Sequence, residues 1–143
     1  KKEEQQKYFK LGVVTALAFA VLFYAISWAF TDTLVALFNS EGIEVLAQYA
    51  REGMRLYFIG FFFSGINIFI CSYLSAITRA NTAFVASLLR GVVAIVLCSI
   101  LLSNLLGLKG VWLAFPAAEA LTLMFVLGVL AIGGRNKKLK KVM

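Results

Sequence analysis

Long apolar runs separated by shorter polar segments make up most of this chain. Four runs have the length of a membrane span, at residues 11–30, 56–78, 91–108 and 110–134. A helix of about 20 mostly apolar residues crosses a hydrocarbon core about 30 Å thick, whereas strands of membrane barrels have about 10 residues and alternate polar with apolar positions. The pattern therefore predicts an all-α integral membrane segment with four transmembrane helices and no separate soluble domain.

The polar link at 31–55 is longer than a simple turn. Its first part, TLVALF, is apolar enough to lie at the membrane interface or to extend the first helix. Asn39 or Ser40 is expected to cap a new helix that has Glu41 and Glu44 in its first turns, where acidic side chains are stabilising. We expect this helix to continue into the second span and to project above the membrane.

Composition supports the membrane assignment and explains the positive charge. Hydrophobic residues make up 62% of the chain, against about 45–50% in soluble domains. The net charge of +7 reflects basic residues that lie outside the apolar runs, and no basic stripe is interleaved with stacking aromatic residues. We therefore expect the chain to contact membrane lipid and no nucleic acid.

Lysine and arginine predict the orientation in the membrane. Of the 14 basic residues, eleven lie in the N-terminal tail, in the loop between the second and third spans, and in the tail 135–143. They are Lys1, Lys2, Lys7, Lys10, Arg79, Arg90, Arg135, Lys137, Lys138, Lys140 and Lys141. Arg51, Arg55 and Lys109 lie on the opposite side. Because basic loops stay in the cytoplasm, we expect a multi-pass protein of the plasma membrane, here the bacterial inner membrane, with both termini cytoplasmic.

The residue types that most enzymes use are scarce. The chain has no histidine, and its two cysteines, Cys71 and Cys98, lie inside apolar runs without metal-ligand spacing. A glycine-rich phosphate loop that ends in Lys-Ser or Lys-Thr is absent as well. We therefore expect no catalytic residue, no metal site, no resident cofactor and no enzymatic activity.

Polar residues inside the apolar runs are the candidates for function. Glu119 lies in the fourth run, three residues after Pro116, and Asn67 lies in the second. If the fourth helix begins near Gly110, a rise of about 1.5 Å per residue puts Glu119 roughly 14 Å along it, near the middle of the core. An ionised acid facing lipid there is costly, so we expect Glu119 to face the protein interior. Three roles remain open: a structural hydrogen bond, proton or cation handling, and contact with a transported cation.

Two further features of the spans affect the expected cavity. Pro116 removes a backbone donor and is expected to bend the fourth helix. Phe58, Phe62 and Phe69 have the spacing of one helical face. That face is either bulk facing lipid or the wall of an apolar substrate cavity.

Four motifs, taken in order, resemble a known transporter family. They are LF before an acidic helix start, FSGIN leading into YLSAITR, SLLRG, and GLKGVWLAFPAAE. This series resembles the multidrug and toxic compound extrusion family, over nearly the whole chain. The resemblance implies the last four spans of a twelve-span, two-lobed transporter, within its C-terminal lobe. The missing partners would then be the N-terminal lobe and the first two spans of the C-terminal lobe.

The resemblance also implies an activity, which is export of small cationic or amphipathic compounds driven by sodium ions or protons. The chain departs from the family pattern at one place. Some members carry a cation-coupling carboxylate in the span equivalent to 56–78, where this chain has no acidic residue, and Asn67 is the nearest polar side chain. Coupling is therefore assigned to Glu119 and Asn67, with sodium and proton both open.

Two alternative functions remain. One is a related flippase for lipid-linked oligosaccharides, which is expected to line its cavity with arginines. No arginine lies inside a predicted span, and this favours drug export. The other is a complete four-span protein with a structural role, or a small exporter that works by self-association.

Overall fold

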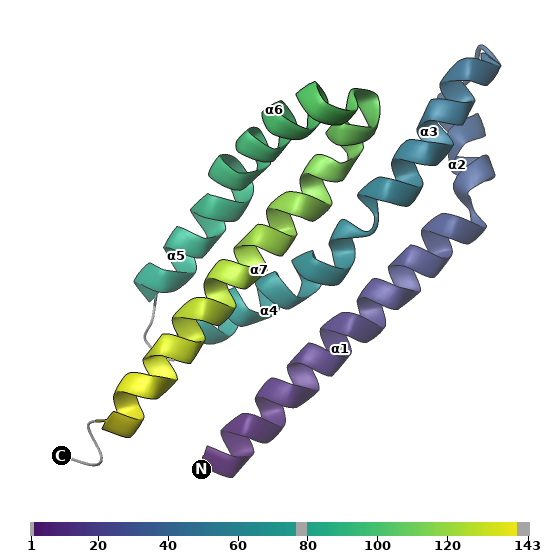
Figure 1. The fold of residues 1–143 in the computed structure, drawn as a ribbon. Helices are drawn as coiled ribbons and strands as arrows, with labels where there is room; N and C mark the ends of the chain where they lie inside the picture. Colours follow the sequence, from purple (N-terminus) through teal and green to yellow (C-terminus); the bar gives the residue numbers. More distant parts are fainter. Residues whose placement is uncertain (1, 77–79, 140–143) are drawn as a thin grey trace.

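The computed structural model describes residues 2–76 and 80–139, and every element in these ranges is a helix. The elements are α1 (Lys2–Ala29), α2 (Thr31–Phe38), α3 (Glu44–Tyr57), α4 (Gly60–Ala76), α5 (Ala80–Leu88), the π-helix η1 (Leu89–Ala94), α6 (Ile95–Leu106) and α7 (Leu108–Leu139). The all-α prediction is confirmed. The start of α1 and the end of α7 lie at the same end of the bundle, and α2 and the α6–α7 turn lie at the other (Figure 1).

Four stretches are long and apolar enough to cross a membrane: Glu3–Ala29, Glu44–Ala76, Ala80–Leu106 and Leu108–Ile132. Four spans were predicted, but the bounds of the third were wrong. It begins at Ala80 and not at residue 91, because α5, η1 and α6 continue one another across Arg90. The prediction fails because a single charge, Arg90, lies inside this apolar helix and not at its start.

The link between the first two spans differs from its prediction in detail. TLVALF lies in a separate short helix, α2, and α3 begins at Glu44 with Ile43 at its N-cap. Asn39 therefore does not cap α3. Its side-chain amide donates to the Ile43 carbonyl at 3.0 Å, and its side-chain oxygen accepts from the Ile43 N–H at 3.2 Å. Asn39 closes the loop, and Glu41 lies in that loop outside the helix.

The second span is helical from Glu44 to Ala76 apart from a break at Phe58 and Ile59. At about 1.5 Å per residue, 33 residues extend roughly 50 Å, which exceeds a core of about 30 Å. The chain changes direction at the break, where α3 gives way to α4 (Figure 1). The long second span that was predicted is present, but it consists of two helices and not of one continuous helix.

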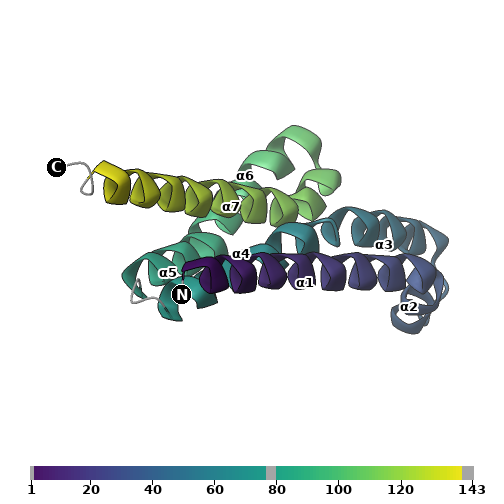
Figure 2. The same ribbon diagram turned by 90° about the horizontal axis from the view of Figure 1, so that it is seen from below.

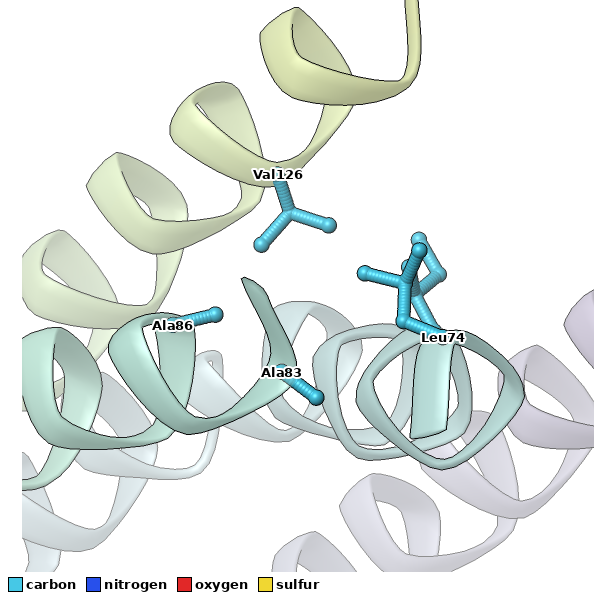
Figure 3. Packing of buried hydrophobic residues seen from close by; sticks show 5 residues of the cluster. Leu74, Ala83, Ala86 and Val126 are labelled. Carbon is cyan, nitrogen blue, oxygen red and sulfur yellow. The ribbon is translucent and has the colours of Figure 1, made fainter. Parts of the chain in front are cut away.

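Helix α4 is the central element of the bundle. It passes between α1 and α7 and contacts both (Figure 2). One buried cluster joins α4, α5 and α7 through Ile70, Leu74, Ala83, Ala86 and Val126, as Figure 3 shows. A second cluster joins η1, α6 and α7 through Ala94, Cys98, Ala114 and Ala118. Small residues at these contacts let the helices approach closely, as in other membrane bundles.

Much of the apolar surface is not covered by the chain itself. Helix α1 exposes about half of the surface of Phe19, Leu22 and Phe23. Contiguous apolar faces of this size are found against lipid or another protein surface. The fold therefore requires an apolar surrounding along most of its length.

Basic residues at the end of the bundle remote from the termini are all held by partners. Arg51 pairs with Asp32 at 2.7 Å and with Glu44 at 3.1 Å, Lys109 pairs with Glu52 at 2.8 Å, and Arg55 lies 4.9 Å from the ring centre of Trp28. Exposed pairs of this kind contribute little stability. They do place these three cations at one end of the bundle, as the charge pattern predicts.

Candidate functional site

Asn67 and Glu119 meet in the interior of the bundle. The Asn67 side-chain amide donates to the Glu119 carboxylate oxygen Oε2 at 2.7 Å and to the Glu119 backbone carbonyl at 2.9 Å. Asn67 is fully buried, and Glu119 is 3% exposed. The two candidates that were selected separately from the sequence therefore form one site between α4 and α7.

The sequence reasoning missed the third member of this site. Arg90 lies in η1, and its Nε is 3.6 Å from Oε1 of Glu119. The charge pattern predicts a cytoplasmic loop at Arg90, and this prediction is wrong. It lies ten residues into the span Ala80–Leu106, which is roughly 15 Å along the helix. A search for apolar runs that tolerates one internal charge would have found it.

Hydroxyl groups complete the polar surroundings. Ser64, one turn before Asn67 on α4, is a hydrogen-bonding neighbour of the Glu119 carboxylate. Thr122, one turn after Glu119 on α7, is fully buried and donates to the Ala118 carbonyl at 2.9 Å. Ser64 thus contacts the carboxylate, whereas the Thr122 hydroxyl hydrogen-bonds to a carbonyl of its own helix.

Two buried polar atoms at the site have no hydrogen-bond partner, and both belong to residues already named. They are the side-chain oxygen of Asn67 and the Nη1 nitrogen of Arg90. Most buried polar groups in proteins are paired, and an unpaired one costs free energy. One unmet acceptor and one unmet donor, on the two side chains that contact the same carboxylate, indicate that the hydrogen bonding of the site is incomplete in this arrangement.

Pro116 lies inside α7, which continues as one helix from Leu108 to Leu139. Proline cannot donate to the carbonyl four residues earlier, so the Trp112 carbonyl loses its usual helical partner. Helix geometry is retained despite this loss, and the expected bend remains a prediction. Pro116 is buried one turn before Glu119.

The three phenylalanines do not share one surface. Phe58 lies at the break between α3 and α4 and contacts Tyr57 and Phe61. Phe62 and Phe69 instead face α1, where their rings meet those of Tyr24 and Phe9. The expectation of a single face was wrong because the helix is interrupted between Phe58 and Phe62.

Phe58 belongs to a separate apolar hollow of about 470 Å³ between α2, α3 and the start of α7. Its other lining residues include Leu34, Met54, Tyr57 and Trp112. None of the residues of the buried Asn67–Glu119 site lines this hollow. The substrate-cavity role of the phenylalanines is therefore a prediction that the four helices alone do not test.

A sequence model of the MatE family matches residues 1–100. The chain belongs to the MatE family. MatE proteins are membrane transporters, in agreement with four apolar helices of spanning length. No curated protein and no solved structure matches the chain.

The MatE match includes two of the three residues of the site. Asn67 and Arg90 lie within residues 1–100, and Glu119 lies beyond them. The sequence motifs predicted the multidrug and toxic compound extrusion (MATE) family, and the MatE match confirms that assignment. The fourth motif, which contains Glu119, lies outside the matched residues.

Proposed function

We propose that the chain is part of a secondary active exporter, in which export of cationic or amphipathic compounds is coupled to entry of sodium ions or protons. The observation that supports this most is the carboxylate of Glu119, buried in the middle of a membrane bundle and held by Asn67. Acids at this depth are costly and rare, and where they occur they commonly mark ion or proton pathways. A purely structural link between α4 and α7 would need no charge.

The coupling would work through two conformations of the full transporter. Glu119 takes up a sodium ion or a proton from one side of the membrane and releases it to the other. An ion that binds one conformation better shifts the equilibrium toward it by its difference in affinity. Glu119 and Asn67 are on different helices, so a change at the carboxylate alters the contact between α4 and α7.

The remainder of the transporter supplies what these helices lack. In this proposal the partners are an N-terminal lobe and the first two spans of the C-terminal lobe, which together enclose the substrate. The exposed apolar faces of α1 and α6 are consistent with such neighbours and with lipid. We place the protein in the bacterial inner membrane, with both termini in the cytoplasm.

Replacement of Glu119 by glutamine in the full-length protein tests the proposal. Glu119→Gln keeps the shape and the hydrogen bonding but removes the charge. The variant should insert normally and should lose dye efflux, or show a shifted dependence on pH or sodium. Glu52→Gln is the matched control, because Glu52 pairs with Lys109 at the end of the bundle. Export and ion dependence that are unchanged in Glu119→Gln would refute coupling and leave a structural role.

One observation favours a second candidate, a flippase for lipid-linked oligosaccharides. The argument against it was that no arginine lies inside a span, and Arg90 now does. A guanidinium binds phosphate well, and the Arg90 side chain is partly exposed. Proteoliposomes containing the full-length protein separate the two functions. An exporter moves cationic dyes along an ion gradient, whereas a flippase moves a fluorescent pyrophosphate-linked lipid across the bilayer.

A further inference from the structure

We propose that Arg90 is a built-in counter-cation, which competes with the coupling ion for the Glu119 carboxylate. This inference rests on the proposed coupling role of Glu119 and deepens it. Arg90 would neutralise the carboxylate when the site holds no ion, and it would be displaced when an ion binds. Ion and arginine would thus occupy the site in turn.

The geometry of the pair is that of a loose contact. The Arg90 Nε and Glu119 Oε1 atoms are 3.6 Å apart, whereas a charge-assisted hydrogen bond of this type is about 2.7–2.9 Å long. Nη1 of the same guanidinium is buried without an acceptor. Arg90 is therefore close enough to balance the charge of Glu119 but forms no forked, two-bond pair with it. A loosely held cation is one that an ion can replace.

Oxygen atoms around the carboxylate are arranged to accept another positive species. The Asn67 side-chain oxygen is fully buried and has no donor. The Ser64 hydroxyl borders the same carboxylate. An unmet acceptor is costly in the interior, and a small cation or a proton shared with this oxygen would remove the cost. This unpaired oxygen belongs to the side chain whose amide holds Oε2 of Glu119, where the competition would occur.

The backbone beneath Arg90 is suited to two positions of its side chain. Leu89–Ala94 forms a π-helix between two α-helical segments. Such wide turns are rare and are frequent at functional sites. A turn that exchanges π for α hydrogen bonds rotates its side chains about the helix axis. Arg90 could therefore leave Glu119 without the unfolding of α5 or α6.

Charge balance gives the physical reason for such a device. A bare carboxylate in a low-dielectric interior is very unfavourable, and breaking a buried pair leaves an uncompensated charge. A transporter that releases its ion must still change conformation with the site empty. With Arg90 against Glu119, the empty site remains neutral during that step. Among the described residues, Arg90 is the charged neighbour that acts on this carboxylate.

The test compares Arg90→Gln with the wild-type full-length protein. An opposite charge at this distance changes the affinity of a carboxylate for a positive species by about tenfold or more. In Arg90→Gln, the sodium or proton concentration for half-maximal dye efflux should fall by about that factor. Maximal efflux should also fall, because the ion leaves more slowly. Purified Arg90→Gln should gain more thermal stability from sodium, or from lower pH, than wild type does.

Matched controls separate competition from general damage. Arg55→Gln removes an arginine that lies over Trp28 at the end of the bundle, and its half-maximal ion concentration should not change. If Arg90→Gln does not accumulate in the membrane, Arg90→Lys tests the competition in its place. Lysine keeps the charge on a more strongly hydrated group, so the half-maximal ion concentration should fall by a smaller factor at normal yield.

The outcomes distinguish this inference from the function on which it rests. One outcome overturns the competition and leaves the coupling. In it, Glu119→Gln loses efflux, while the half-maximal ion concentration is unchanged or raised in both Arg90 variants. Normal efflux and ion dependence in Glu119→Gln overturn the coupling itself. A lowered half-maximal concentration in Arg90→Gln, with Arg55→Gln unchanged, supports the competition.

Discussion

Gly110 lies directly against the backbone of Leu102 across the turn that joins α6 to α7. A Cβ atom at position 110 would overlap the Leu102 carbonyl group. Gly107, which ends α6, has a φ of 61° and a ψ of −135°, a conformation that is essentially open only to glycine. The two glycines allow the chain to reverse within a single residue between two long helices.

Replacement of Gly110 by alanine should destabilise the protein, because backbone atoms cannot move aside as a flexible side chain can. Overpacking of a close contact costs about 1–3 kcal/mol. We expect a lower thermal midpoint and a lower folded yield in detergent. Gly128→Ala is the control, since its Cβ would meet open space in α7 and alanine favours a helix by up to about 1 kcal/mol. Equal effects of the two substitutions would contradict the close contact.

Asn67→Ala should be much more harmful than Asn104→Ala. Asn67 is the donor to the buried carboxylate and carbonyl of Glu119, and loss of one buried partner costs about 1–3 kcal/mol. Asn104 is exposed, and its amide donates to the Ile100 carbonyl of its own helix at 2.8 Å. Thermal unfolding of both full-length variants checks this. Comparable losses would mean that the contact between α4 and α7 contributes little.

Thiol labelling should test the predicted orientation. Single cysteines would be placed at Lys2, Ser40, Asn81 and Lys138, in a background where Cys71 and Cys98 are alanine. We expect a membrane-impermeant reagent to label only the Ser40 site in intact cells. The structure supports the choice of Ser40, which is exposed in the loop between α2 and α3. Helix α2 lies at the end of the bundle remote from the start of α1 and the end of α7. Labelling of the Lys138 site from outside would show that the predicted orientation is wrong.

The segment by itself should not transport. The described residues leave the apolar face of α1 uncovered, and in the proposed transporter other spans complete the enclosure of the substrate. Purified and reconstituted alone, it should show no gradient-driven movement of cationic dyes, while the full-length protein does. Strong export by the isolated segment would instead support a small exporter that works by self-association.

Features that depend on apolar length were predictable from the sequence. Four spans, the helical class and the burial of Glu119 follow from the cost of polar groups in hydrocarbon. The family was also predictable, because its motifs keep their order along the chain. These inferences need only residue type and spacing.

Features that depend on the partner of each residue were not predictable. Arg90 was assigned to a loop because a charge normally ends a span, and its partner Glu119 is 29 positions later. No particular amino-acid composition marks the π-helical turn that carries Arg90. Next to the break at Phe58 and Ile59, Gly60 lies against the ring of Phe115 on α7. Local sequence specifies neither contact.

The wide turn at Leu89–Ala94 also affects how the third span tolerates changes in length. A one-residue difference in a helix corresponds to about 100° around its axis. Before the turn, Ala83 and Ala86 pack into the cluster with Leu74, and after it Cys98 packs against α7. Deletion of one residue there would leave the helix intact but turn its second half away from α7. Homologous transporters should therefore accept insertions in their loops while keeping the residue count between positions 83 and 98 constant.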